Sequence, residues 1–258
     1  MSIAYLALPD KIIAQQYEFG ATGVATGYMG DINNANPLYY KDMGGGLFVK
    51  YNLNPTWGIR GSFNYLRLYG NDYDFQYENQ QNRGLLFNNN LKEFSVTGEF
   101  NFFRFIAGRH NRRYTPYLLG GIAVINHNPY ISYEGNRVYL RDYPLEIDAQ
   151  DMDVTYSKWA VSIPVGAGFK YNIRGPWSIG AEINYRTVLS DHIDAVSQYY
   201  KYGTAGLPDP WALMADPTEQ LAQRGGTLRG NGKNLDGYMT AGITLTYTLI
   251  SKRCYWWQ

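Results

Sequence analysis

The side chains in this sequence that could do chemistry gather in one segment. His192 lies between Asp191 and Asp194, and Ser190 comes just before them. A histidine beside two carboxylates could act in acid–base catalysis or bind a metal ion, but in a polar connection it is more typical of a solvated cluster. Ser190 and His192 are too near in sequence to indicate a catalytic triad, which is defined by geometry. We therefore predict no catalytic residue, no metal site and no cofactor.

A single cysteine, Cys254, lies in the C-terminal segment 251–258. In an oxidising compartment, a lone cysteine is either a free thiol or one half of an intermolecular disulfide. We hypothesise that Cys254 tethers a partner protein by such a disulfide. The basic and aromatic residues around it also fit simple anchoring at a membrane interface, so both interpretations stay open.

The elements that would position these residues are marked by alternation. One C-terminal segment places on one face Met239, Ala241, Ile243, Leu245, Tyr247 and Leu249. Its other face carries Thr240, Gly242, Thr244, Thr246 and Thr248. A period of two residues is that of a β-strand with one face toward an apolar medium and the other toward water. Similar segments recur along the chain, which is typical of a transmembrane β-barrel.

Composition favours the same class of protein. The chain has 258 residues, with 25 Tyr, 6 Trp and 28 Gly, which suits the aromatic belts and twisted strands of a barrel. A soluble β-sandwich is the alternative on composition alone. No segment approaches the roughly 20 consecutive apolar residues that a membrane-spanning helix requires. The net charge of +1 indicates no basic surface for nucleic acid.

The order of strands and connections separates the barrel from the sandwich. We expect strands at residues 17–32, 43–53, 57–69, 94–102, 116–126, 158–173, 177–186 and 239–249. Three short links are expected at 52–57, 104–115 and 174–176. Four long loops are expected, one between the first two strands and the others at 70–91, 128–157 and 190–236. Strict alternation of short and long connections predicts an all-β, eight-stranded antiparallel up-and-down transmembrane β-barrel, with short turns in the periplasm. A sandwich has no reason to sort its loops by length.

These boundaries divide the chain into three parts. Residues 1–16 contain a short apolar run without a preceding Lys or Arg, and we interpret them as a truncated signal-peptide remnant. An ordinary soluble N-terminus is the competing interpretation. Residues 17–250 form the barrel, and residues 251–258 form a periplasmic tail. The prediction places the protein in the bacterial outer membrane as a multi-pass protein in contact with its lipid.

The inward face of the predicted barrel carries a set of charges. They are Lys50, Arg60, Glu99, Lys170, Glu182 and Arg186, together with Glu18. An eight-stranded barrel has room inside only for side chains, and charges buried there must pair or be solvated. We expect a network of ion pairs that closes the lumen. A selective ion path lined by the same charges is the alternative.

Two further expectations concern aromatic residues and a proline. We expect interface anchors beside the short turns at Tyr51, Trp57, Phe102, Tyr117, Tyr171 and Trp177, and toward the long loops at Tyr28, Tyr69, Trp159 and Tyr238. Pro164 interrupts a strand and removes one ladder hydrogen bond, so a local β-bulge is expected there.

Five motifs carry a family resemblance. They are Gly-Tyr-Met-Gly-Asp-Ile-Asn at 27–33, Pro-Tyr-Leu-Leu-Gly-Gly-Ile-Ala-Val at 116–124, Ile-Pro-Val-Gly-Ala-Gly-Phe-Lys-Tyr-Asn at 163–172, Ser-Asp-His-Ile-Asp-Ala-Val-Ser at 190–197 and Asp-Gly-Tyr-Met-Thr-Ala-Gly-Ile-Thr-Leu-Thr-Tyr-Thr at 236–248. With these motifs the chain resembles the PorG-type outer-membrane proteins of the Bacteroidota type IX secretion system. The resemblance implies a non-enzymatic component that works with a periplasmic lipoprotein-containing ring in protein secretion. The incomplete signal peptide is a departure from that family.

Three functions follow as hypotheses. The first is an assembly component that docks periplasmic secretion-system proteins through the basic link and the tail, with candidate residues Arg104, Arg109, Arg112, Arg113 and Cys254. The second is an adhesion or ligand-binding barrel that acts through the long loops at 70–91 and 190–236. The third, an outer-membrane enzyme, would need catalytic groups that these residues do not assemble.

Overall fold

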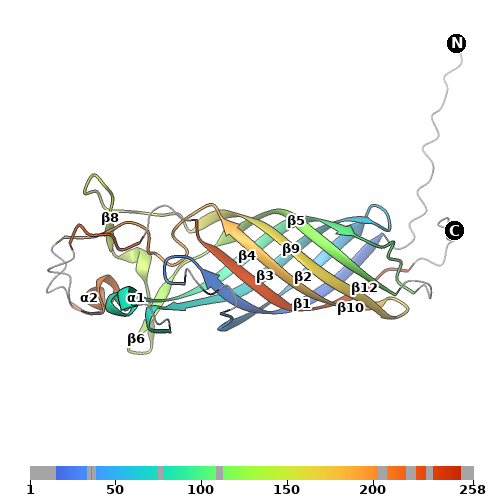
Figure 1. Ribbon diagram of the computed structural model, residues 1–258, viewed down its shortest axis with the longest axis horizontal. Helices are drawn as coiled ribbons and strands as arrows, with labels where there is room; N and C mark the ends of the chain where they lie inside the picture. The colour runs from blue at the N-terminus through green and yellow to red at the C-terminus, as the bar shows by residue number, and fades with distance from the viewer. Residues whose placement is uncertain are drawn as a thin grey trace, which may run out of the picture.

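The computed structural model describes residues 16–33, 36, 39–74, 78–108, 113–202, 208–218, 225–230 and 235–250. Most of these residues lie in a long antiparallel barrel (Figure 1). Its strands are β1 (Tyr17–Met29), β2 (Asp42–Asn52), β3 (Trp57–Asn71), β4 (Leu86–Asn101), β5 (Tyr114–Asn126), β9 (Trp159–Arg174), β10 (Trp177–Val188) and β12 (Gly237–Thr248).

The strands form a closed sheet. Their order is β3-β2-β1-β12-β10-β9-β5-β4, and β3 also pairs with β4, which completes the ring. Every pairing between neighbours is antiparallel. Strands that are consecutive among these eight are neighbours, and the first strand pairs with the last. The prediction of an eight-stranded up-and-down barrel is therefore confirmed.

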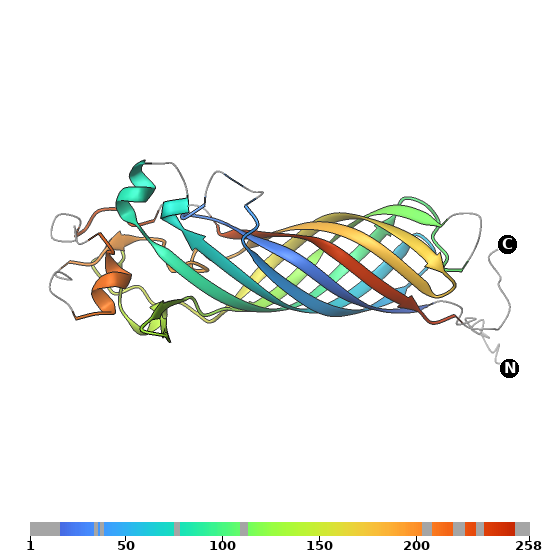
Figure 2. The same cartoon turned by 90° about the horizontal axis from the view of Figure 1, so that it is seen from below.

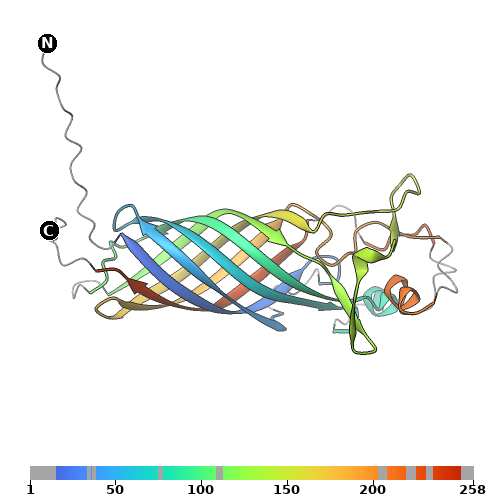
Figure 3. The ribbon, with the colours of Figure 1, turned by 180° about the vertical axis from the view of Figure 1, so that it is seen from behind.

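Short connections gather at one end of the barrel. Figures 2 and 3 show that β1 begins and β12 ends at this same end. In the β2–β3 turn, the Asn54 side chain accepts hydrogen bonds from the backbone N–H groups of Thr56 and Trp57, both at 2.8 Å. In the β9–β10 turn, Gly175 has a φ of +54°, a conformation that a residue with a Cβ rarely adopts. Local turn chemistry therefore closes these links tightly.

The long connections build a folded cap at the opposite end (Figure 1). It contains η1 (Asp72–Asp74), α1 (Glu78–Arg83), β6 (Tyr130–Tyr133), β7 (Asn136–Tyr139), η2 (Leu140–Asp142), β8 (Glu146–Ile147), β11 (Tyr199–Tyr200) and α2 (Trp211–Ala215). β6 and β7 form a hairpin, and β8 pairs with β11. The cap is thus made of small ordered elements that belong to several different loops.

One predicted loop is shorter than expected. We predicted a polar connection over 70–91, but β3 continues to Asn71 and β4 begins at Leu86. The two strands stay in register to their ends, where Asn71 is paired with Leu86. The asparagines of this stretch are compatible with strand because alternate positions, including Phe87 and Leu91, are fully buried inside. Inward packing outweighed the low strand propensity of Asn.

The outer surface of the barrel is apolar. Outward side chains on the strands include Phe19, Leu47, Val49, Phe63, Phe94, Ile122, Val165, Phe169, Ile179, Ile243 and Leu245, all exposed. A contiguous apolar surface of this kind suits a lipid environment, and the polar residues between them face inward. Among the described residues, no helix is long and apolar enough to span a membrane.

The hydrophobic core lies toward the cap. Its fully buried members include Tyr28, Ile32, Leu66, Leu68, Phe87, Leu91, Ile125, Val188, Ile193 and Tyr238. These side chains come from the inward faces of strand ends and from the loops above them. The lumen is therefore filled by apolar side chains at its capped end and by polar side chains elsewhere.

Two local expectations are wrong. Pro164 causes no β-bulge, because its strand keeps one register with β10 through Arg186, and the shift in that ladder lies instead at Trp177 and Ser178. Three tyrosines expected as interface anchors point inward: Tyr28, Tyr117 and Tyr238 are each 3% exposed or less. Each of the three hydroxyls donates a hydrogen bond to a carboxylate inside, and that partner makes the inward orientation favourable.

Candidate functional site

The first layer of charges lies near the short turns. Lys50 Nζ is 2.6 Å from Glu18 Oε2 and 2.9 Å from Glu99 Oε1. Lys170 contacts the same oxygen of Glu99. Lys50 and Glu99 thus each have two partners of opposite charge. The four side chains are at most 9% exposed, so the network replaces the water that these charges lose on burial.

The middle layer is built around Glu182. Arg60 Nη1 lies 2.7 Å from Glu182 Oε2, which also accepts a hydrogen bond from the Tyr117 hydroxyl at 2.7 Å. Asn184 donates to the other oxygen, Glu182 Oε1, at 2.6 Å. The Arg60 guanidinium also stacks over Phe48, 3.9 Å from the ring centre. Both oxygens of this carboxylate are therefore satisfied inside the barrel.

The third layer lies toward the cap and centres on Glu93. Arg186 donates two hydrogen bonds to Glu93, from Nε to Oε2 at 2.6 Å and from Nη2 to Oε1 at 3.3 Å. The Tyr238 hydroxyl donates to Glu93 Oε2 at 2.5 Å, and Asn64 donates to Oε1 at 2.6 Å. Such a bidentate arginine–carboxylate pair is geometrically specific.

All six lumen residues named from the sequence, and Glu18, lie inside and take part in these layers. Sequence reasoning missed Glu93, because the loop was assigned up to Leu91 and the strand from Phe94. Glu99, Thr97 and Ser95 face inward with a period of two residues, and the next position of that series toward the N-terminus is Glu93. Glu93 balances Arg186, so the four carboxylates of the three layers, Glu18, Glu93, Glu99 and Glu182, match the four cations Lys50, Arg60, Lys170 and Arg186.

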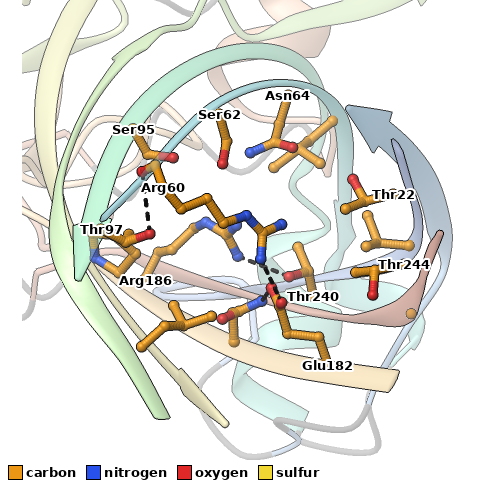
Figure 4. Close-up of a pocket in the computed structure, with 16 residues that line it drawn as sticks. Thr22, Arg60, Ser62, Asn64, Ser95, Thr97, Glu182, Arg186, Thr240 and Thr244 are labelled. Carbon is orange, nitrogen blue, oxygen red and sulfur yellow. Dashed lines mark hydrogen bonds and ion pairs between the residues drawn. The ribbon is translucent and has the colours of Figure 1, made fainter. Parts of the chain in front are cut away.

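A small cavity separates the middle layer around Glu182 from the third layer around Glu93, which is the upper layer. Its volume is about 30 Å³, and its lining includes Arg60, Asn184, Arg186, Thr22, Thr240 and Thr244. Figure 4 shows Arg60 reaching across this space to Glu182. The hydroxyl and amide groups make the wall polar.

The link between β4 and β5 closes the short-turn end. Phe105 and Ala107 are buried, and Lys170 lies over the Phe105 ring at 5.3 Å. The Phe105 N–H donates to the Pro55 carbonyl, and the Gly108 N–H donates to Asn172. Residues 105–108 of this link therefore fold back over the mouth of the barrel and are held there by these contacts.

The predicted docking residues are only partly described. Arg104 is exposed at the start of the link. The Arg113 carbonyl, at its end, accepts a hydrogen bond from the N–H of Asn172 at 2.6 Å. Arg109, Arg112 and Cys254 lie outside the described residues, as do positions 1–15 and the tail at 251–258.

At the base of the cap, three distant segments meet. The Tyr28 hydroxyl, at the end of β1, lies 2.5 Å from Asp194 Oδ2 and 2.9 Å from Asp236 Oδ1. Asp236 Oδ2 accepts the Ile193 N–H at 2.8 Å, and Asp194 Oδ1 accepts the Val196 N–H at 2.9 Å. Burial, followed by the charge of a neighbouring aspartate, raises the pKa of both Asp194 and Asp236.

This geometry corrects the interpretation of 190–194 as a solvated cluster. Asp194 is 1% exposed and Ile193 is fully buried. Asp191 is half-buried, and burial together with the charges of Asp31 and Glu146 raises its pKa to about 7. The segment is internal because the loops above it fold over the barrel mouth. Among the described residues, no group of three or more potential ligands is arranged to hold a metal ion.

Two arginines, the buried Arg229 and the partly buried Arg83, join the cap loops to each other. Arg229 Nη1 bonds to Glu146 Oε1 at 2.9 Å and to the Ala195 carbonyl at 2.6 Å. Arg83 grips Asp72 with two bonds of 2.8 Å and also donates to the carbonyls of Asp31 and Arg229. These bonds tie loops from four parts of the chain into one body.

Three aromatic rings stack beside this cluster. The Tyr156 ring lies between His127 and His192, with centroid distances of 6.4 Å and 4.9 Å. His127 is buried, and neither of its ring nitrogens has a hydrogen-bond partner among the described residues. Burial, together with the charges of His192 and Arg141, lowers the pKa of His127 to about 4. Burial also lowers the pKa of His192. The stack is thus a neutral packing unit between two loops, the β5–β9 connection and the β10–β12 connection.

The fold and its closed lumen define the class: this is an eight-stranded transmembrane β-barrel. A family model described as "Domain of unknown function (DUF6089)" matches residues 1–202, and the chain belongs to that family. No curated protein matches the sequence.

Solved structures give distant likenesses. The chain is similar to the N-terminal β-barrel domain of Pseudomonas aeruginosa OprF, at 12% identity and a TM-score of 0.42, covering 92% of this chain and 99% of that one. Neisserial surface protein A is similar at 10% identity and a TM-score of 0.47, with 92% and 99% covered. For Yersinia pestis Ail, the attachment invasion locus protein, the values are 16% and 0.40, with 90% and 97% covered. These likenesses are too distant to transfer a function.

Proposed function

We propose that this protein is a non-enzymatic component of the bacterial outer membrane that acts as an anchor for other proteins. The observation that carries the proposal is the closed lumen, in which three layers of paired charges and an apolar core fill the interior. A barrel that is filled in this way leaves its two ends as the surfaces on which it can work. The exposed apolar belt supplies the contact with lipid.

We propose further that the short-turn end faces the periplasm and docks the lipoprotein-containing ring of a type IX secretion system, as the PorG-type resemblance implies. One structural feature supports docking at this end. Phe105 holds the start of the link between β4 and β5 in place through its buried ring and its backbone hydrogen bond. The neighbouring Arg104 is therefore exposed on an anchored backbone. A pre-organised basic surface loses little entropy on binding an acidic partner.

The test is co-purification of partners from native membranes. Arg104, Arg109, Arg112 and Arg113 are changed together to Ala, and the exposed Arg137 and Lys158 at the cap end are changed to Ala as the control for loss of positive charge elsewhere. We expect the four-arginine variant to lose periplasmic partners while the control retains them. Retention of all partners by both variants would contradict docking at this end.

The proposed disulfide tether needs its own experiment. Non-reducing electrophoresis of native membranes is expected to show a slower band that disappears in Cys254→Ser. If only monomer is present, the tether is ruled out. Docking through the arginines would then be judged on the co-purification result alone.

A second candidate function is surface recognition through the cap. It is favoured by the construction of the cap, where the partly buried Arg83 and the buried Arg229 tie several loops together. A rigid platform for variable loop tips is the usual arrangement of a binding surface. Trimming of the exposed β6–β7 tip at Glu134 and Gly135, with loss of surface binding and unchanged periplasmic partners, would support this function over docking.

A further inference from the structure

The cavity inside the barrel has unsatisfied polar groups in its wall. Nε of Arg60 and Oδ1 of Asn184 are buried, and neither has a hydrogen-bond partner among the protein groups that the structure describes. Both residues line the cavity, and both are more than nine-tenths buried. A buried donor and a buried acceptor without partners are rare, because each loses its hydration on folding.

The size of the cavity limits what it can hold. About 30 Å³ is available, and a single water needs roughly 10–15 Å³ of this kind of volume. The space therefore accepts roughly two water molecules and excludes sugars, amino acids and larger solutes. Cavities that stay dry are apolar, whereas threonine, serine and asparagine side chains line this one together with Val24, Leu66, Leu119 and Pro164.

The charge balance of the wall argues for a neutral occupant. Arg60 is paired with Glu182, and Arg186 is paired with Glu93. Both arginines are thus neutralised by a carboxylate, so the wall has no excess positive charge to bind an anion. It likewise has no excess negative charge to bind a metal ion. The remaining groups, one donor and one acceptor with several hydroxyls, match a water molecule, which both donates and accepts.

We propose that this cavity is a structural hydration site, in which ordered water bridges Arg60 Nε and Asn184 Oδ1 within the middle ion-pair layer. Arg60 reaches Glu182 across the space, and Arg186 and Thr240, which are hydrogen-bonded to each other, also line it (Figure 4). Water in this position satisfies the two orphan groups and completes the hydrogen bonding of the layer formed by Arg60, Glu182 and Asn184. The first layer of charges lies on the short-turn side of the site, and the apolar core lies on its cap side.

The test is crystallography of the whole protein with two soaks. In the native crystals, density for about two waters is expected within hydrogen-bond distance of Arg60 Nε and Asn184 Oδ1. Crystals soaked in bromide and crystals soaked in rubidium are expected to show no anomalous peak in the cavity. An empty cavity at a resolution that orders other internal waters would overturn the proposal. An anomalous peak from either ion would overturn it too, because the site would then hold a charged ligand.

Two variants sharpen the outcome. Arg60→Lys keeps the cation beside Glu182 but removes Nε, so the water next to residue 60 should be lost while the water at Asn184 remains. Thr56→Val, in the β2–β3 turn outside the cavity, is the control and should leave both waters in place. The shift between heated and unheated protein in gel electrophoresis verifies that each variant forms a barrel. Unchanged density in Arg60→Lys would contradict the proposed bridge.

Discussion

The Tyr28 hydroxyl donates a hydrogen bond to Asp194 Oδ2 at 2.5 Å, and the Tyr28 hydroxyl oxygen also lies 2.9 Å from Asp236 Oδ1. One hydroxyl has a single proton, so it cannot donate to both carboxylates. The second short contact is satisfied when one carboxyl keeps its own proton and donates to the tyrosine oxygen. The end of β1, the loop at 190–194 and the start of β12 are joined through this shared arrangement.

The first prediction concerns this tyrosine. Tyr28→Phe leaves two buried carboxyls without their common partner, and we expect the free energy of unfolding to fall by about 1–3 kcal/mol. Urea titration of the protein in lipid vesicles measures the change. Tyr65→Phe, on the outer face of β3, is the control and should have little effect. Equal effects of the two changes would mean that the Tyr28 hydroxyl contributes nothing specific.

The second prediction is a pH dependence at Asp191. Its pKa in the folded protein is raised to about 7, above the value of about 3.9 in an unfolded chain. The folded state therefore binds more protons, and stability falls as the pH rises from about 4 to about 7. In Asp191→Asn this fall should be smaller. Urea midpoints measured at several pH values between 4 and 8 test this. Asp148→Asn, at an exposed turn of the cap, supplies the comparison.

The third prediction has the opposite sign and concerns His127. Its pKa is lowered to about 4 by burial, below the value of about 6.5 in an unfolded chain. The contribution of the neutral ring is present above about pH 6.5 and is lost as the pH falls toward 4. His127→Phe, which keeps the stack on Tyr156, should remove this acid-induced loss. Hydrogen exchange of the loop at 127–131 between pH 4 and 7 is the measurement. An unchanged profile in the variant would show that the ring does not report on pH.

The fourth prediction tests the upper ion pair. Glu93→Gln leaves the Arg186 guanidinium buried without its carboxylate, which is expected to cost about 3–5 kcal/mol. Glu134→Gln, at an exposed turn, should be nearly neutral. The double variant Glu93→Gln with Arg186→Met should recover part of the loss, because no unpaired charge then remains inside. Failure to recover any stability would mean that packing around Glu93, and not charge, decides the effect.

The fifth prediction tests the closure of the short-turn end. Phe105→Ala removes the buried ring below Lys170, and the free energy of unfolding is expected to fall by about 3 kcal/mol. Phe103→Ala, on an exposed ring two residues earlier, is the matched control. The same variants can be assayed in planar bilayers. Conductance should stay absent in Phe105→Ala, since the ion-pair layers and the apolar core still fill the barrel.

Much of the fold could be predicted from the sequence because strand alternation is local. The period of two residues places Lys50, Arg60 and Glu182 on the inward face whatever their partners are. The sorting of short and long links then indicated the closed barrel. The same reasoning misses Glu93, because the predicted strand begins at residue 94 whereas β4 begins at Leu86.

Pairing across the barrel was decided only by the tertiary structure. Alternation cannot tell that Arg186 grips Glu93, or that Tyr28, Asp194 and Asp236 meet, because these residues are separated by up to 208 positions. Such contacts depend on which strands face each other once the barrel has closed. For the same reason Tyr28, Tyr117 and Tyr238 look like interface anchors in sequence, yet each turns inward to a carboxylate. The sequence by itself determined which face each side chain takes along most strands, and three-dimensional closure determined its partner.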